Sequence, residues 1–393
     1  MACEACQGPG AEHSARNHSP LRRYALQLSA RADPSIRNPA RMSGQRSAQV
    51  CGRCHGQRIS AEVGRFLRHG DPFVPGDDLS QRSEPLWRET TQNGQTGLFA
   101  PRFWNDGTAR LTAYEFQGYL QSPCARDERF SCESCHAMHR GDPRGPLRPD
   151  RLGDAACTQC HAALAGADAL RAHSHHAPDG PGARCASCHM PALVYGLVDV
   201  RISHRIESPD PALQARDARP DACTLCHVDR TRAWAAQVSE RWYGRRTVSS
   251  VPDAVPAPRS ELARLPEVTR ALFGGDPIER AIAAHALGRA TAQAAPEQRR
   301  RALGALARVL SDDAYPAVRR IAERSLRRRL GEARPELLPL LAVYSAGLPP
   351  TRRAALLEPL RAALVPQAAQ AIGPQTRSAL QAQAVQLAIE IGE

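Results

Sequence analysis

Paired cysteines constrain this chain more than any other feature of its sequence. Of the 13 cysteines, 12 form six C-x-x-C pairs, and Cys124 stands alone. The pair Cys3–Cys6 is followed by Gln7, whereas each of the other five pairs is followed directly by histidine. These five motifs are Cys51-Gly-Arg-Cys54-His55, Cys132-Glu-Ser-Cys135-His136, Cys157-Thr-Gln-Cys160-His161, Cys185-Ala-Ser-Cys188-His189 and Cys223-Thr-Leu-Cys226-His227. The cysteine chemistry is therefore confined to the first part of the chain.

The spacing C-x-x-C-H is the attachment signature of a c-type haem. The two thiols form thioethers with the two vinyl groups, and the adjacent histidine then lies below the iron as its proximal ligand. Because histidine fills only 14 of 393 positions, chance does not explain five histidines at the same place. The sequence therefore predicts five covalently bound haems with five proximal ligands: His55, His136, His161, His189 and His227.

Other uses of paired cysteines account less well for this pattern. Zinc ribbons need no histidine directly after a cysteine pair. A disulfide framework is typical of small secreted domains and has no use for the histidines. A thioredoxin-like motif occurs once, in a βαβ context, rather than five times. The single Cys124 is interpreted as a buried inert thiol, with a reactive thiol as the alternative.

Histidines outside the motifs form a second pool of candidate iron ligands. Five irons with two imidazoles each need five further histidines. His285 alone lies beyond the motif region, and eight others lie within it: His13, His18, His69, His139, His173, His175, His176 and His204. His139 follows His136 by about one helical turn, so we expect it to bind the iron of a neighbouring haem. Met138 and Met190 are alternative thioether ligands, although packing against haem explains them better.

The chain changes character after the last motif. Residues 1–246 combine the motifs with dense proline and glycine, which favours irregular backbone and short helices around closely spaced haems. Residues 247–259 resemble a Pro-rich linker. Residues 260–393 are rich in Ala, Leu and Arg with helical periodicity. The predicted fold class is mainly α: a loop-rich multihaem cytochrome c domain with short helices, followed by an all-α HEAT-like helical-repeat domain.

Helical signals in the last segment recur at a spacing of about 40 residues, which is typical of HEAT repeats. A helix is expected from Asp276 to Gly288, with an early proline and a terminal glycine. Further amphipathic stretches are expected at 297–310, 316–330, 335–344 and 351–364. We expect an α-solenoid that docks other proteins, with a plain helical bundle as the alternative.

From Cys3 to about Arg245, the sequence resembles the multihaem c-type cytochromes with doubled C-x-x-C-H motifs, a family that often carries a helical-repeat tail. The resemblance rests on the motif order, on Cys132-Glu-Ser-Cys-His-Ala-Met-His139, on His175-His176 before Cys185, and on Trp234 after Cys223-Thr-Leu-Cys-His. It implies distal iron ligands at His13, His69, His139, His175 or His176, and His204.

Two features depart from that family. Its first motif normally reads C-x-x-C-H-G-P-G, and here Gln7 replaces the histidine. A sixth haem at Cys3 and Cys6 would keep its thioethers but lose its proximal ligand. The family usually has an export signal and further motifs upstream, so we expect the natural gene to extend beyond the start of this sequence.

The motifs predict an electron carrier with closely spaced bis-histidine haems and no catalytic residues. The alternative is an oxidoreductase that acts on a small nitrogen or sulfur oxide, such as nitrite or hydroxylamine, at one open iron. A scaffold with purely structural haems is a third, weaker interpretation. Other redox proteins are the expected partners. A periplasmic or other extracytoplasmic location is expected, because haem is attached to c-type cytochromes outside the cytoplasmic membrane.

Net charge does not point to nucleic acid. The formal charge is +12, and all 52 basic residues are arginine. Each ferric haem adds about −1 through its propionates, so five haems lower the charge to roughly +7. Arginine also offers fork-shaped donors for propionates. No apolar run of about 18 residues occurs, so no membrane span is expected.

Overall fold

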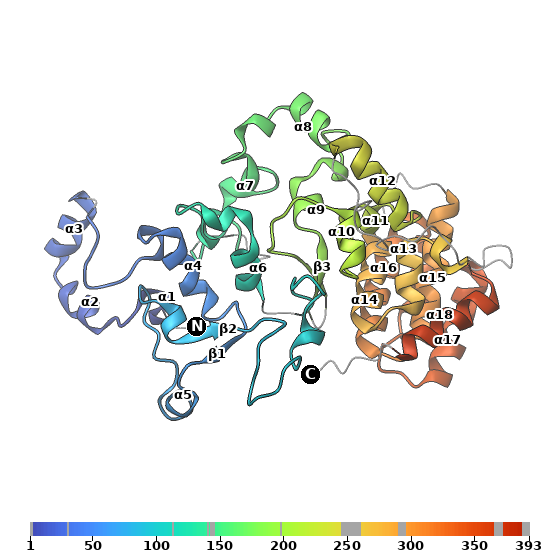
Figure 1. The fold of residues 1–393 in the computed structure, drawn as a ribbon, viewed down its shortest axis with the longest axis horizontal. Helices are drawn as coiled ribbons and strands as arrows, with labels where there is room; N and C mark the ends of the chain where they lie inside the picture. The colour runs from blue at the N-terminus through green and yellow to red at the C-terminus, as the bar shows by residue number, and fades with distance from the viewer. Residues whose placement is uncertain are drawn as a thin grey trace. The chain divides into compact units, whose positions relative to one another are not determined.

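The chain is known from a computed structural model that describes residues 3–29, 31–111, 114–139, 141, 146–196, 199–244, 261–289, 296–364 and 372–386. It is mainly helical, as the sequence predicted (Figure 1). The predicted linker at 247–259 lies outside the described residues. Among those that are described, no helix combines the length and the apolar character needed to cross a lipid bilayer.

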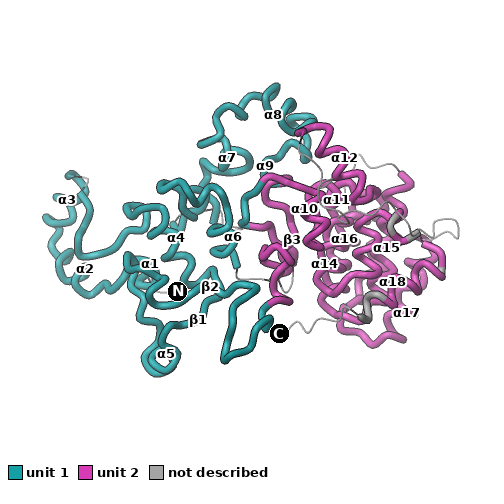
Figure 2. Tube along the Cα trace, in the orientation of Figure 1, with its two compact units in different colours: residues 1–99, 113–186, 204–207 teal, residues 100–112, 187–203, 208–393 magenta. Residues whose placement is uncertain are grey.

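The chain divides into two compact units (Figure 2). Unit 1 comprises residues 1–99, 113–186 and 204–207, and unit 2 comprises residues 100–112, 187–203 and 208–393. The segment 208–244 therefore clusters with the helices after residue 260. Glu267, which is buried, accepts from Arg232 of this segment at 2.7 Å. The two compact units do not coincide with the segments that composition suggests on either side of residues 247–259. A domain boundary at 247–259 therefore stays a prediction.

Short helices joined by loops make up unit 1. Its α-helices are α1 (Glu4–Gln7), α2 (Ala11–Arg16), α3 (Pro20–Ser29), α4 (Gly44–Gly52), α5 (Val63–His69), α6 (Glu115–Gln121), α7 (Ala155–Thr158) and α8 (Ala167–Ser174). Helix α9 (Cys185–His189) begins in unit 1 and ends in unit 2. Strands β1 (Arg58–Ser60) and β2 (Ser83–Pro85) pair antiparallel, with Ile59 opposite Glu84. Several motifs thus lie in single turns that proline and glycine separate.

Unit 1 has little apolar core of its own. Its cluster of buried hydrophobic residues, among those described, is Ala48, Val50, Phe73, Leu79, Phe116 and Tyr119. The thiols of Cys6 and Cys132 pack against this cluster. A core of this size is small for a unit of this length. Porphyrins bound at the bordering cysteines would add the missing apolar surface.

Unit 2 combines a β-hairpin with a larger helical core. Its α-helices are α10 (Pro211–Arg216), α11 (Ala222–Cys226), α12 (Arg232–Tyr243), α13 (Glu267–Gly274), α14 (Pro277–Arg289), α15 (Pro296–Asp312), α16 (Pro316–Ala333), α17 (Pro350–Leu364) and α18 (Pro374–Gln386). Strands β3 (Ala192–Tyr195) and β4 (Val200–Ile202) pair antiparallel, with Tyr195 opposite Val200. Helix α14 packs against both strands and against α11. The buried residues of α14 to α17 form one continuous core with Leu193 and Tyr195 of the hairpin.

The helices expected near 276–288, 297–310, 316–330 and 351–364 are confirmed as α14 to α17. The stretch expected at 335–344 is different, because it forms the 3-10 helix η10 (Pro335–Leu341) with Pro339 inside it. Proline has no N–H to donate and clashes with the preceding turn of an α-helix. Helix α14 packs against α16 and α15 against α17, whereas α18 packs against α13.

Candidate functional site

Each C-x-x-C-H motif contains one helical turn. The backbone N–H of the histidine donates to the carbonyl of the first cysteine at 2.9 Å for His55, 2.9 Å for His136, 3.0 Å for His161 and 2.8 Å for His227. The fifth motif forms helix α9. None of the 13 cysteines forms a disulfide. Each turn therefore presents two thiols and an adjacent imidazole, which is the donor set that a covalently attached haem requires.

The Cys3–Cys6 pair has the same turn without the histidine. The N–H of Gln7 donates to the carbonyl of Cys3 at 3.1 Å, so Gln7 occupies the place that the proximal histidine has elsewhere. Burial raises the pKa of the Cys6 thiol, and the neighbouring Cys51 adds to this effect. The pair can thus form thioethers, while its iron ligand would have to come from another residue.

Neighbouring motifs place their thiols side by side in chain order. In unit 1, Cys6 lies within electrostatic reach of Cys51 and Cys54. Cys51 is hydrogen-bonded to Cys132 of the next motif. Further along, Cys135 lies within electrostatic reach of Cys160, and Cys157 is hydrogen-bonded to Cys185. In unit 2, Cys223 lies near Cys188. Since the thioether sulfurs mark one edge of each haem, consecutive attachment sites are adjacent.

Hydrogen bonds between the motif segments fix this succession. The hydroxyl of Ser47 on α4 donates to Glu133 at 2.9 Å, which ties the first C-x-x-C-H motif to the second. Gln159 donates to the carbonyl of Ser134 at 3.1 Å, which ties the second to the third. The carboxylate of Asp154, just before α7, accepts from the backbone N–H of Cys185 at 2.9 Å. Polar contacts thus join successive motifs of unit 1.

Burial keeps the thiols of Cys185 and Cys223 neutral, whereas a hydrogen bond from Cys51 lowers the pKa of Cys132. Burial raises the pKa of Cys185 to about 12 and that of Cys223 to about 12, against an ordinary value of 9.0. Zinc binds thiolates, which such surroundings disfavour. A thioether is uncharged, so this environment suits covalent haem better. Among the described residues, no three or more His, Cys, Asp or Glu side chains gather where they could hold one metal ion.

The structure brings His204 close to His136, the predicted proximal ligand of the second C-x-x-C-H motif. The two imidazole ring centres are 6.2 Å apart, and the ring planes differ by 26°. Metal–imidazole bonds of about 2 Å place the ring centres of two ligands on opposite sides of one metal about 6 Å apart. The spacing of these two rings therefore fits a bis-histidine iron.

Gly118 on α6 is what allows His204 to come so close. A Cβ atom at position 118 would lie 2.8 Å from the backbone N of Arg205 and 2.8 Å from the carbonyl carbon of His204. The sequence analysis did not identify Gly118. Its only sequence signal is a glycine inside a short helical pattern, which often marks a close backbone approach.

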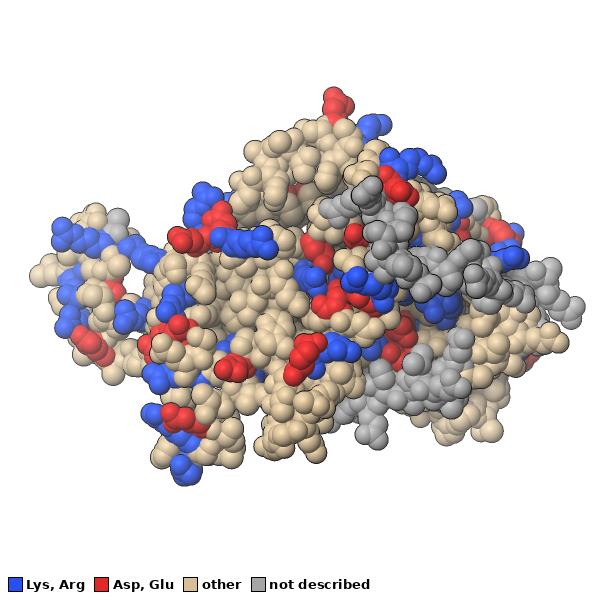
Figure 3. Space-filling model, viewed as in Figure 1, with Lys and Arg blue, Asp and Glu red and all other residues tan. Residues whose placement is uncertain are grey.

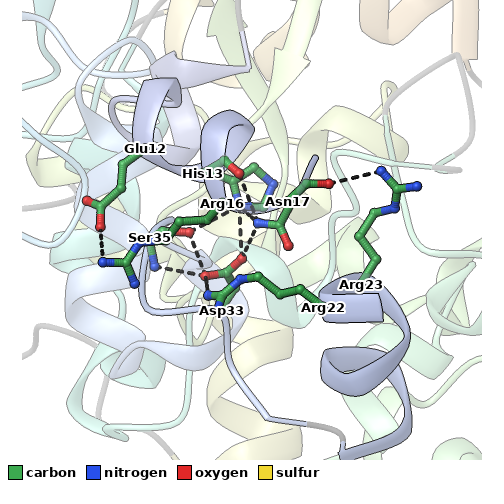
Figure 4. A network of polar contacts seen from close by, with 8 residues as sticks. All are labelled: Glu12, His13, Arg16, Asn17, Arg22, Arg23, Asp33 and Ser35. Atoms are coloured by element: carbon green, nitrogen blue, oxygen red, sulfur yellow. Dashed lines mark hydrogen bonds and ion pairs between the residues drawn. The ribbon is translucent and has the colours of Figure 1, made fainter. Parts of the chain in front are cut away.

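His13 is held by a carboxylate. Its Nδ1 lies 3.1 Å from Oδ2 of Asp33, and Figure 4 shows that Asn17 and Ser35 bind the same carboxylate. Hydrogen bonds from Ser35, with a further one from Asn17, hold the pKa of Asp33 well below its usual range. Iron-binding imidazoles commonly donate their second N–H to such a partner. The arrangement therefore suits a ligand that binds through Nε2.

His176 is oriented in a similar way by a carbonyl group. Its Nδ1 lies 2.6 Å from the carbonyl oxygen of Ser174. Its ring packs against Gly182, where a Cβ atom would lie 2.3 Å from Cδ2 of the ring. The adjacent His175 has a left-handed backbone, with φ of 57°. Of the two alternatives, His176 is half-buried and His175 is exposed.

The other predicted ligands are less enclosed. His69, at the end of α5, and His139 are exposed, as are the proximal His55 and His161. Nδ1 of His55 lies 3.9 Å from Oε2 of Glu115. His227 packs against Trp234, with ring centres 5.0 Å apart. His189 is half-buried at the end of α9.

Comparison with known proteins addresses the centre of this site. Residues 122–166 match the family model described as the doubled CXXCH motif. The match supports a c-type cytochrome with covalently bound haem. The matched segment contains the motifs at Cys132 and Cys157 together with His139. A search of curated proteins and a search of solved structures found no match.

Proposed function

We propose that this protein carries electrons along five covalently bound haems attached in chain order. The observation that carries the proposal is the succession of adjacent cysteine pairs from Cys51 to Cys226, joined by hydrogen bonds between successive motifs of unit 1. When bound, each haem supplies an iron that takes up and releases one electron. The polypeptide holds the attachment turns close together and keeps most of their cysteines half-buried.

The proposed ligand set is the one that the motifs and the family resemblance imply. We propose five proximal ligands: His55, His136, His161, His189 and His227. The distal ligands proposed are His13, His69, His139, His175 or His176, and His204. His204 opposite His136 has the best support, and the carbonyl contact favours His176 over His175. Cys3 and Cys6 offer a further pair of thiols for a sixth haem beyond the five, with Gln7 in the proximal position.

One observation favours the oxidoreductase alternative at a single place. The Cys3–Cys6 turn lacks a proximal histidine, so an iron attached there would have an open or unusual coordination position. An open iron is what the reduction or oxidation of a small nitrogen or sulfur oxide requires. We keep this activity as the second candidate function, restricted to that site.

Location, partners and the tail complete the proposal. We propose a periplasmic or other extracytoplasmic location, with other redox proteins as electron donors and acceptors. Arginine and acidic side chains are interspersed on the face in Figure 3, which suits proteins better than a polyanion such as nucleic acid. We also propose a domain boundary at 247–259 and a HEAT-like docking role for 260–393. An aspartate before each helix supports the repeat: Asp276 accepts from the N–H of Ile278 in α14 at 2.9 Å, and Asp313 accepts from the N–H of Tyr315, just before α16, at 2.8 Å.

The test is haem quantitation combined with EPR of the oxidised protein. Pyridine haemochrome assays should give about five haems per chain, and EPR should show low-spin ferric signals. The C132S/C135S variant should lose about one haem, whereas C124S, the matched control, should lose none. Absence of covalent haem would contradict the proposal. A high-spin ferric component lost in the C3S/C6S variant would favour the oxidoreductase.

A further inference from the structure

Unit 2 carries two motif histidines and one histidine with no assigned role. By sequence, His189 and His227 belong to motifs, and His285 is the remaining histidine of this unit. His285 lies on α14, well beyond the last motif, and neither a motif nor the family resemblance includes it. Unit 1, by contrast, contains all the distal candidates named above.

The two ring nitrogens of His285 have different surroundings. The side chain is 18% exposed, and its Nδ1 lies 3.7 Å from Oδ1 of Asp199, which also pairs with Arg324 at 3.2 Å. The Nε2 atom is buried and has no hydrogen-bond partner among the described residues. A buried polar atom without a hydrogen-bond partner destabilises the fold, so a bound group is expected there. One nitrogen toward a carboxylate and the other toward a metal is the usual arrangement of a ligating imidazole.

The protonation state agrees with a ligand. Burial lowers the pKa of His285 to about 4, and the positive charge of Arg289 adds to this effect, although Asp199 opposes it. The imidazole is therefore neutral near pH 7, and the neutral form is the one that binds a metal.

The nearest haem-attachment turn is α11. Helix α14 packs against α11, and Arg289, one turn after His285 on α14, lies within electrostatic reach of Cys226. Cys223 and Cys226 on α11 are the thiols of the last motif, and His227 follows as its proximal histidine. Helix α14, which carries His285, thus packs beside the attachment turn of the last motif.

We propose that His285 is the distal iron ligand of the haem attached at Cys223 and Cys226. The inference rests on the proposed function, because it needs a haem at the last motif. With His285 on that haem, four of the five distal positions proposed above serve the other four haems. It makes the helical segment part of the redox centre: α14 supplies a ligand, and Asp199 on the β3–β4 hairpin positions that ligand.

Spectroscopy of variants tests this assignment. H285A should keep the full haem count by pyridine haemochrome assay, but one low-spin ferric EPR signal should be replaced by a high-spin signal. H285M should restore a low-spin iron with a raised reduction potential, because thioether ligands favour the ferrous state. H18A, which replaces an exposed histidine outside the proposed ligand set, is the matched control and should leave the EPR spectrum unchanged. D199N should leave the iron low-spin and shift its potential.

The affected haem is identified in a second background. In C223S/C226S, which lacks the last haem, H285A should cause no further loss of low-spin signal. Circular dichroism and the count of the other haems show whether each variant folds. If the wild-type protein contains low-spin haems and H285A retains every low-spin signal, the assignment is wrong while the proposed function stands. If the wild-type protein lacks haem, the proposed function itself fails.

Discussion

At position 118, a single hydrogen in place of a side chain lets helix α6 approach the backbone of His204 and Arg205. Backbone atoms cannot move aside as the end of a flexible side chain can, so a methyl group there must displace the segment. We expect G118A to remove one low-spin haem signal while the haem count is kept, and to lower the free energy of unfolding by about 1–3 kcal/mol. EPR and urea denaturation measure the two effects.

A glycine without neighbours provides the control for this substitution. Gly331 on α16 has nothing within 4 Å of an added Cβ atom. G331A should therefore leave the EPR spectrum unchanged and raise the free energy of unfolding by up to about 1 kcal/mol, because alanine is the better helix former. An unchanged low-spin spectrum in G118A would show that His204 does not depend on the close approach.

Among the elements, helix α14 begins with a reciprocal capping box. Oδ1 of Asp276 accepts from the N–H of Glu279 at 3.1 Å, and Oε2 of Glu279 accepts from the N–H of Asp276 at 2.9 Å. Asp276 also accepts from the buried Arg110 at 2.5 Å. The two hydrogen bonds between Asp276 and Glu279 satisfy backbone N–H donors that have no partner within the first helical turn. This cap sets the start of the helix that carries His285.

The cap predicts a pH dependence. Burial, with Asp276 as second cause, raises the pKa of Glu279 above its ordinary value of 4.5. Folding therefore penalises the ionised form: the contribution of Glu279 to the free energy of unfolding is largest below pH 4.5 and falls as pH rises through the raised pKa. E279Q is neutral at every pH and keeps an acceptor for Asp276. The stability of wild type minus that of E279Q should thus decrease from pH 4 to pH 8 in urea titrations, and an increase would contradict the assignment.

At this scale, local signals explain what the sequence could predict. Periodicity with proline at the start located α14 to α17, because this signal lies within a few helical turns. The proximal histidines stay a prediction from the motifs. The α-helix expected at 335–344 is instead the 3-10 helix η10, which contains Pro339. Two other features depend on tertiary packing of segments that are distant in sequence. These are the approach of His204 to His136 and the packing of α14, which carries His285, against α11. Neither the helical periodicity nor the spacing of the motifs indicates such contacts.

Across the whole molecule, the two units differ in how much apolar core the polypeptide supplies. Unit 2 has a continuous core that extends from β3 through α14 to α17. The six-residue core cluster of unit 1 is bordered by Cys6 and Cys132. Small cores need an additional source of stability, and covalent cofactors provide one. Haem attachment should therefore matter more for the folding of unit 1 than for that of unit 2.

Production of the chain without haem attachment tests this difference. We expect the apoprotein to keep helical circular dichroism from unit 2, while limited proteolysis cuts rapidly within residues 1–99 and 113–186 and spares residues 261–289 and 296–364. The holoprotein is the control and should resist cleavage in both units. The physical reason is that unit 2 buries enough apolar surface to fold without the cofactor. Cleavage at equal rates in both units of the apoprotein would contradict the prediction.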